Sequence, residues 1–260
     1  MNTTEVVDLD KLLAFAKEIV LQAGEKIAEA HHSYEEELEI NEAHHHDLKI
    51  QLDVDVQKLL ETAIGNEFPE HHILGEEGGE GSGGKGYEWI LDPIDGTVNL
   101  VYGIPHFCVS VACRLDDVIQ CGVIYDPIRK ECFFAKRGGG AFCNERPITT
   151  GQRKDIKECI LAVGFSKTRE SIEKCLELYQ YYGRHARKLR AMGSAALDMA
   201  YIACGRLDGY IEQDIKIWDI AAGMVILEEA GGAIDLIPHS TKPHHFAIKA
   251  SNGCVKLTRS

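Results

Sequence analysis

The hydrophobic positions of this chain predict five helices. From Leu9 to Ala30, apolar residues recur every three or four positions behind a polar Asp8, which indicates an amphipathic helix capped by that aspartate. A second helix of the same kind is expected over roughly Asp53–Phe68. Three further helices are predicted over Thr168–Tyr182, within Arg190–Cys204 and over Trp218–Gly232.

Shorter apolar runs predict strands. From His106 to Thr150, consecutive runs are separated by turn signals at Asp116-Asp117 and Asp126-Pro127, and Gly138–Gly140 predicts a tight corner, so we expect an antiparallel meander. The polar segment His31–His46 is expected to be an irregular loop. Single strands are predicted at His71–Gly75, Tyr87–Leu91, Ile160–Ser166 and Leu207–Gln213.

Two segments suggest ligand binding but are better explained as loops. The triplet His44-His45-His46 suggests a metal site, yet adjacent side chains point in different directions and rarely bind one ion together, which favours a solvated loop. The glycine-rich stretch Gly75–Gly86 contains both a dinucleotide pattern and a phosphate-loop pattern. A strand follows it instead of a helix, and Gly86 stands where the phosphate loop needs serine or threonine, so a surface loop is favoured.

Composition and charge narrow the class of protein. The 260 residues suffice for one large domain or two small lobes with a sizeable core. A net charge of -13 argues against a surface for nucleic-acid phosphates and suits a protein that collects cations. There is no apolar run of about 18 residues and no basic region at the N-terminus, so we expect neither a membrane span nor a signal peptide. The nine scattered cysteines are typical of reduced thiols in a cytoplasmic protein.

The stretch Trp89–Asn99, WILDPIDGTVN, carries the most suggestive chemistry. An apolar strand delivers Asp92 and Asp95 into a turn, because Pro93 disfavours helical geometry at the residue before it. Gly96-Thr97 then opens a possible helix, and carboxylates followed by free helix N–H groups can hold cations and a phosphate together. A strand-exit turn with Asp95 as a helix cap explains the same residues equally well.

Other acidic residues at the ends of predicted elements favour the cation-binding reading over the helix cap. Glu76 follows a predicted strand; Asp219 begins a predicted helix, where capping alone would explain it. Asp53 is either an N-cap or an acceptor aimed into a site. Carboxylates gathered in one partly dry place repel one another and require shifted pKa values or cations. Oxygen ligands without cysteine or well-placed histidine favour Mg²⁺, and Mg²⁺ held by few carboxylates commonly serves phosphoryl transfer.

Five segments in order resemble the inositol monophosphatase family, whose members are Mg²⁺-dependent, lithium-sensitive phosphatases. The resemblance runs from the first helix to about Asn252. It implies an α/β fold, a layered αβαβα sandwich of the inositol monophosphatase and fructose-1,6-bisphosphatase type. It further implies a single domain over 1–260, with an N-terminal metal-binding lobe to about residue 150 and a C-terminal lobe from about 151. The segments are GEE at Gly75–Glu77, WILDPIDGTVN, GAFCNERPI within Gly139–Ile148, RAMGSAALDMA at Arg190–Ala200 and WDIAAGMVILEEAGG at Trp218–Gly232.

The resemblance also implies metal ligands. Glu76, Asp92 and the backbone carbonyl of Ile94 would hold a first Mg²⁺. Asp92, Asp95 and Asp219 would hold a second, so that Asp92 bridges the two ions. A third, weaker ion would lie near Glu76. Mn²⁺ is expected to substitute for Mg²⁺, and Li⁺ to inhibit.

Catalytic and substrate-binding roles follow in the same way. Thr97, hydrogen-bonded to Asp53, would orient a water beside the first metal, and Glu76 and Asp92 would act with them in catalysis. Glu212 matches the family's hydroxyl-recognising glutamate. The residues that the resemblance places against the substrate are Gly96, Thr97, Gly193, Ser194, Ala195, Glu212 and Asp219.

The chain departs from the family pattern in three places. Glu42 stands where the family usually has a lysine, with Lys49 near enough to compensate. The glycine-rich loop after Glu77 is expected to be less ordered than usual. The chain stops soon after Asn252, so the last helix of the family is expected to be short or absent.

These observations predict hydrolysis of a phosphate monoester, with the small phosphorylated polyol myo-inositol 1-phosphate as the expected substrate. Histidinol phosphate, fructose 1,6-bisphosphate and 3′-phosphoadenosine 5′-phosphate stay open, because a fold does not choose its substrate. A regulatory or binding protein that keeps the fold without turnover is the alternative from another class. A homodimer is expected by resemblance alone, with no membrane and no nucleic-acid polymer as partner.

Overall fold

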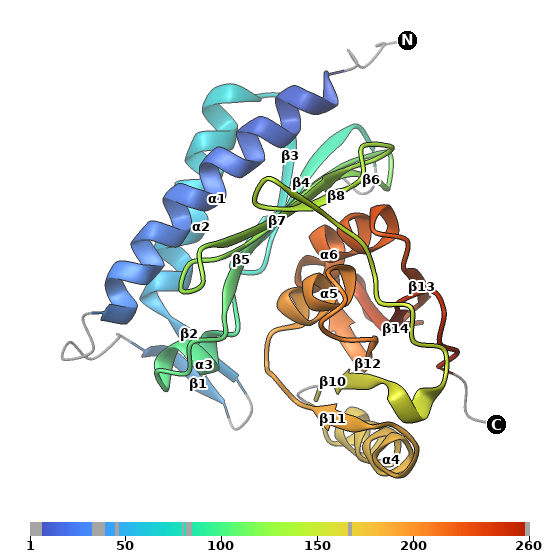
Figure 1. The fold of residues 1–260 in the computed structure, drawn as a ribbon. Coiled ribbons are helices and arrows are strands. Elements are labelled where there is room, and N and C mark those ends of the chain that lie inside the picture. The colour runs from blue at the N-terminus through green and yellow to red at the C-terminus, as the bar shows by residue number, and fades with distance from the viewer. Residues whose placement is uncertain are drawn as a thin grey trace.

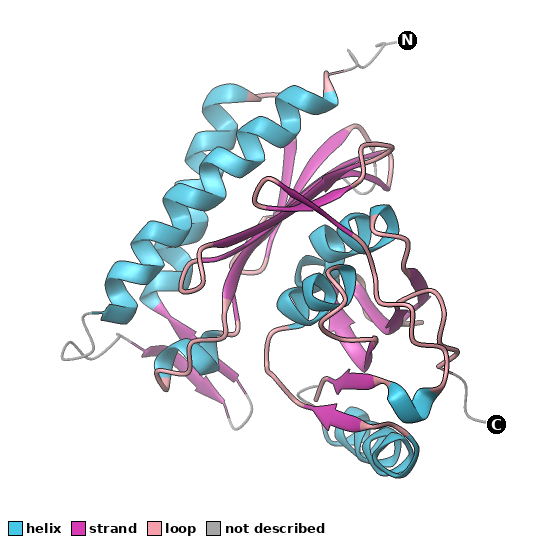
Figure 2. Ribbon diagram, viewed as in Figure 1, coloured by secondary structure: helices cyan, strands magenta, loops and turns pink. Residues whose placement is uncertain are grey.

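The protein is built in alternating layers of helices and sheets (Figures 1 and 2). The computed structural model describes residues 7–32, 40–44, 47–79, 81, 85–165 and 168–257, and no side chain between 32 and 49. The outer layer holds the two long helices α1 (Leu9–His32) and α2 (Gln51–Glu67). Asp8 caps α1 as predicted, since its carboxylate accepts a hydrogen bond from the backbone N–H of Asp10.

A seven-stranded sheet forms the second layer. Its strands follow sequence order; β3 and β4 are parallel and every later pair is antiparallel, which confirms the predicted meander. The strands are β3 (His72–Gly75), β4 (Tyr87–Asp95), β5 (Cys108–Leu115), β6 (Val118–Asp126), β7 (Glu131–Lys136), β8 (Ala141–Cys143) and β9 (Arg146–Ile148).

Side chains of this sheet alternate between two cores. On β4, Trp89 and Leu91 pack against α1 and α2, whereas Ile90 between them faces the other way. The second face is covered by α5 (Ala195–Ala203) and α6 (Ile217–Glu229), which share one buried cluster with it. A strand buried on both faces reads as a continuous apolar run, which is why Tyr87–Leu91 showed no clear alternation.

The second sheet lies beyond α5 and α6, and α4 (Arg169–His185) covers its outer face (Figure 1). Its strand order is β11-β10-β12-β14-β13, with β10 parallel to both neighbours. The order α1/α2, sheet, α5/α6, sheet, α4 confirms the predicted layered α/β sandwich. The strands are β10 (Ile160–Val163), β11 (Lys188–Arg190), β12 (Gly209–Lys216), β13 (Ala233–Pro238) and β14 (His245–Ser251), and a 3-10 turn, η1, spans Ile156–Glu158.

The structure contains strands that the sequence did not predict. The loop expected at His31–His46 contains β1 (Ile40–His44), which pairs with β2 (Asp47–Ile50) in an antiparallel hairpin. Both strands are mostly polar, so they lack the alternation of apolar residues from which a strand is predicted. Strands β13 and β14 were missed altogether.

Some predictions concern residues whose placement is not described. The side chain of His44 and residues 45–46 lie outside the described part, as do residues 80 and 82–84 of the glycine-rich loop. Glu42 and Lys49 are backbone partners across the β1–β2 hairpin, but their side chains are likewise not described. The expectation that Lys49 compensates for the lysine missing at Glu42 stays a prediction.

Candidate metal and substrate site

A β-bulge in β4 turns two aspartates toward the same side of the sheet. Asp92 pairs with Ser110 and Asp95 with Cys108, so β4 has one residue more than β5 in this interval. Residues two apart on a strand face the same way, and the extra residue therefore places both carboxylates on the α5/α6 side. The turn predicted from Pro93 is wrong, because the strand continues to Asp95 and the proline is accommodated in the bulge.

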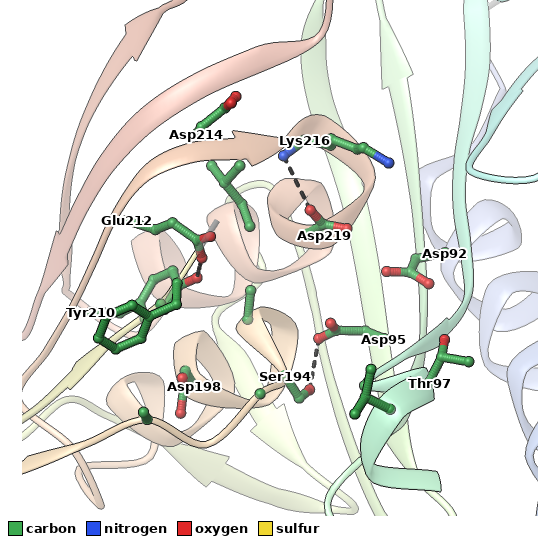
Figure 3. Close-up of a pocket in the computed structure, with 18 of the residues that line it drawn as sticks. Asp92, Asp95, Thr97, Ser194, Asp198, Tyr210, Glu212, Asp214, Lys216 and Asp219 are labelled. Carbon is green, nitrogen blue, oxygen red and sulfur yellow. Dashed lines mark hydrogen bonds between the residues drawn. The ribbon is translucent and has the colours of Figure 1, made fainter. Parts of the chain in front are cut away.

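Glu76 and Asp219 complete an acidic cluster with Asp92. Glu76 follows β3 directly, and because β3 and β4 are parallel, their carboxyl ends meet. Asp219 comes from the first turn of α6. One carboxylate oxygen from each of the three residues lies within 4.8 Å of the others. Figure 3 shows Asp92, Asp95 and Asp219 around one open space.

The electrostatics of the cluster favour a cation. Burial and the neighbouring acids, Glu76 first among them, raise the pKa of Asp92 and of Asp219 well above the usual range. Burial also raises the pKa of Asp95 to about 6. The Oδ2 atom of Asp92 is buried without a hydrogen-bond partner. An all-carboxylate set with an unsatisfied buried oxygen fits a hard divalent cation such as Mg²⁺.

Asp95 is held by the neighbouring helix. Its Oδ2 atom accepts hydrogen bonds from the Ser194 hydroxyl at 2.6 Å and from the Ala196 backbone N–H at 2.7 Å. It therefore stabilises the N-terminus of α5, and the alternative reading of Asp95 as the cap of its own helix is wrong. That helix, α3 (Thr97–Val101), begins after Gly96, whose positive φ of 98° suits glycine.

Thr97 links the cluster to α2. Its hydroxyl lies 2.9 Å from the carbonyl oxygen of Ile94 and 3.3 Å from Oδ1 of Asp53. Asp53 is the third residue of α2, not its N-cap, and also accepts the backbone N–H of Ile50 at 3.0 Å. Burial raises the pKa of Asp53 to about 7. The two readings left open for Asp53 thus combine, since its carboxylate satisfies the helix start and reaches Thr97.

The same helix-start geometry recurs at Asp219. As the third residue of α6, it accepts the backbone N–H of Lys216 at 3.1 Å. Asp219 therefore satisfies the backbone at the start of α6 from the third helical position, not as the N-cap residue, and it also belongs to the acidic cluster.

A cavity of about 410 Å³ extends from the cluster toward the second sheet. Asn99 holds one wall in place: its amide donates to the carbonyls of His106 and Met192, which ties α3 to the segment before Gly193. The site residues that the sequence predicted all line this cavity except Asp53, which lies behind Thr97. They are Glu76, Asp92, Ile94, Asp95, Gly96, Thr97, Gly193, Ser194, Ala195, Glu212 and Asp219.

Sequence reasoning missed several residues of this cavity. The Lys216 ammonium group lies 3.3 Å from Oε1 of Glu76, and Lys242 lies 2.6 Å from Asp214. Tyr210 donates a hydrogen bond to Glu212, and Asp198 lies in the same wall. The signal available for Tyr210 and Lys216 was their place on the strand and helix start that carry Glu212 and Asp219.

Comparisons with known proteins agree with this geometry. The model of the inositol monophosphatase family matches residues 8–256. The chain is 44% identical over 185 residues to "Nus factor SuhB" of Xylella fastidiosa, covering 69% of this chain and 67% of that protein. It is 39% identical over 184 residues to "Inositol-1-monophosphatase" of Rhizobium meliloti, covering 70% and 69%. The solved inositol monophosphatase of Anabaena (Nostoc) sp. superposes with a TM-score of 0.82 and 33% identity, covering 95% of this chain and 93% of that one.

Proposed function

Since the chain belongs to the inositol monophosphatase family, we propose that it is a Mg²⁺-dependent hydrolase of phosphate monoesters, with myo-inositol 1-phosphate as substrate. One observation carries the proposal. Glu76, Asp92 and Asp219 converge within 4.8 Å at the end of a cavity that also contains Thr97 and Glu212. A phosphate placed there would lie between the acidic cluster and a pocket large enough for a sugar-sized alcohol.

The cluster suits the cations that the family requires. We propose that Glu76, Asp92 and the Ile94 carbonyl hold one Mg²⁺, that Asp92, Asp95 and Asp219 hold another, and that a third lies near Glu76. Such ions supply a Lewis acid that activates water and offsets the charge of the departing ester oxygen. Asp92 contributes the unpartnered oxygen expected of a bridging ligand.

The protein's own groups would orient the attack. The Thr97 hydroxyl is held between Asp53 and the Ile94 carbonyl, and would position a water beside the phosphate. Asp53, with a pKa raised to about 7, can take up a proton through this contact near neutral pH. The N–H groups at Gly96-Thr97 would contact the phosphate, and Gly193–Ala195 with Glu212 the alcohol.

Other features of the proposal follow the family. Mn²⁺ would replace Mg²⁺, Li⁺ would inhibit, and two chains would form a homodimer. No helix among the described residues is long and apolar enough to cross a membrane. None of the nine cysteines forms a disulfide, which supports the proposed cytoplasmic location.

The test is phosphate release from a panel of substrates, measured with Mg²⁺ and with chelator. The panel contains inositol 1-phosphate, histidinol phosphate, fructose 1,6-bisphosphate and 3′-phosphoadenosine 5′-phosphate. Mg²⁺-dependent release led by inositol 1-phosphate supports the proposal in full. Release led by another member of the panel keeps the chemistry and replaces the substrate.

A regulatory role is the second candidate, because several relatives are named Nus factor SuhB. The two candidates differ in one measurable property. If folded protein releases no phosphate from any substrate at saturating Mg²⁺ or Mn²⁺, the hydrolase proposal fails and the regulatory role takes its place.

A further inference from the structure

The end of the cavity away from the acidic cluster is formed by two carboxyls and a phenol. Tyr210 and Glu212 lie on β12 and Asp198 on α5, and all three are at least nine-tenths buried. Figure 3 shows Tyr210 and Glu212 joined by a hydrogen bond, with Asp198 on the helix beside them. None of the roles given above involves Asp198 or Tyr210.

The carboxylate of Glu212 is fixed in one orientation. The Tyr210 hydroxyl donates to its Oε2 atom. Gly164 lies against the same oxygen: a Cβ atom there would lie 1.9 Å from Oε2 of Glu212 and 2.7 Å from the Tyr210 hydroxyl. Because only glycine leaves room, the phenol and the backbone just after β10 together hold the Glu212 carboxylate against rotation. A preorganised acceptor loses less entropy when it binds a hydroxyl.

Asp198 has an unsatisfied oxygen in the same wall. Its side chain is 2% exposed and lines the cavity, and its Oδ1 atom has no hydrogen-bond partner. Burial, followed by the charges of Asp95 and Glu212, raises the pKa of this carboxyl well above its usual range. A buried polar atom without a partner costs about 1–3 kcal/mol, so a ligand that supplies the partner gains that much.

The cationic groups of the cavity are matched by acids. Among the described residues that line it, Lys216 contacts Glu76, while Lys242 and His245 both contact Asp214 at 2.6 Å. Of the residues that the structure describes, none in the wall around Asp198 and Glu212 is a lysine, arginine or histidine. Such a wall offers hydrogen-bond partners to hydroxyl groups, and the Glu212 carboxylate disfavours a second phosphate.

We propose that Asp198 is a specificity-determining residue that binds a hydroxyl of the substrate together with Glu212, and that Tyr210 is the positioning residue for Glu212. The substrate class is then a monophosphate of an uncharged polyol, in preference to a bisphosphate. This inference rests on the hydrolase function proposed above.

The test compares Asp198→Asn and Asp198→Leu with wild type on inositol 1-phosphate and on 4-nitrophenyl phosphate, which has no hydroxyl. The two substitutions are expected to raise KM for inositol 1-phosphate by about 5- to 150-fold, the equivalent of about 1–3 kcal/mol. Turnover of 4-nitrophenyl phosphate should change by less than about twofold, and the asparagine variant should discriminate less against fructose 1,6-bisphosphate. Asp126→Asn is the matched control, since Asp126 is equally buried but lies outside the cavity.

Tyr210→Phe tests the positioning role. It is expected to raise KM for inositol 1-phosphate in the wild-type background and to have no further effect in a Glu212→Gln background, because its role passes through that carboxylate. A structural role alone would lower the melting temperature in both backgrounds without this dependence.

The outcomes separate the inference from the function on which it rests. A wild type without phosphatase activity overturns the proposed function. An active wild type whose Asp198 variants slow both substrates equally, or leave the selectivity unchanged, overturns the inference and leaves the hydrolase standing.

Discussion

At the scale of single residues, the site depends on carboxylates that carry more than one contact. Asp95 accepts two hydrogen bonds from the start of α5 while facing the cavity. Asp53 and Asp219 each satisfy the backbone at the start of their own helix and face other site residues. Because these contacts fix the carboxylates before any ligand arrives, the site is preorganised for the cations and phosphate of the proposed function.

Asp92→Asn should abolish most turnover. The substitution preserves shape but removes one negative charge from the centre of the acidic cluster, where Asp92 has an unpartnered buried oxygen. The loss in kcat/KM should exceed the roughly 10–100-fold typical of removing a residue that only supports a metal ligand. Steady-state kinetics over a range of Mg²⁺ concentrations, with circular dichroism to verify folding, provide the measurement. Wild-type activity in this variant would contradict the metal assignment.

Lys216→Gln should tighten cation binding. The ammonium group lies 3.3 Å from Oε1 of Glu76, so it opposes a second cation at the same carboxylate. Calorimetric titration with Mn²⁺ should give a Kd several-fold lower than that of wild type. Lys174→Gln is the control, because that lysine pairs with Glu170 on the surface of α4. Unchanged or weaker Mn²⁺ binding would show that Lys216 supports the cluster instead of competing with the ion.

At the scale of elements, the functional groups lie where elements end. Asp92 and Asp95 come from the bulge at the end of β4, and Glu76 follows β3. Ser194 caps the start of α5, and Asp219 lies in the first turn of α6. Backbone N–H groups at helix starts have no partner within the helix, so acidic side chains are stabilised there. The packing of α5 and α6 against the large sheet then brings these ends together.

Ser194→Ala should weaken both α5 and the site. The Ser194 hydroxyl accepts from the Leu197 backbone N–H and donates to Asp95, so its removal costs about 1 kcal/mol of capping energy. We expect the melting temperature to fall by about 2–4 °C and more Mg²⁺ to be needed for half-maximal activity. Asp8→Ala removes the cap of the distant helix α1. It should lower the melting temperature similarly and leave the Mg²⁺ requirement unchanged; if both variants changed that requirement alike, the link through Asp95 would be wrong.

At the scale of the whole molecule, the buried acids connect metal binding to stability. Asp53, Asp92, Asp95 and Asp219 all have raised pKa values because folding buries them near one another. The folded protein therefore retains protons that the unfolded chain has already released. Cations bound at these carboxylates would favour their charged form and so remove the repulsion between the buried acids.

In chelator, stability should fall as the pH rises. Between the unfolded value of 3.8 and the folded values of about 6 for Asp95 and about 7 for Asp53, the native state binds more protons than the unfolded state. The free energy of unfolding then decreases as the pH rises through this window. Thermal unfolding at pH 5 and pH 7.5 measures the effect, and Asp53→Asn should reduce it. Mg²⁺ should raise the melting temperature more at pH 7.5 than at pH 5, and equal gains at both values would refute the linkage.

The sequence by itself determined the helices α1 and α2, the antiparallel meander and the identity of the acidic residues. These follow from local periodicity and from motifs of three to fifteen residues, which constrain the backbone near them. The β1–β2 hairpin was not predicted, because its polar strands lack the alternation of apolar residues that indicates a strand. Strands β13 and β14 were likewise identified only from the structure.

Only the tertiary structure decided how the acidic residues are used. The sequence predicted a turn after Asp92, whereas pairing with β5 produces a bulge that directs Asp92 and Asp95 to one side. It left a cap of its own helix as one reading of Asp95, whereas the packed protein uses this residue at the start of α5, about one hundred residues away. The contacts of Tyr210, Asp198 and Lys216 arise from the approach of layers distant in the chain. Hydrophobic spacing records which face of an element is buried, but the partners across that face are set by how the layers pack.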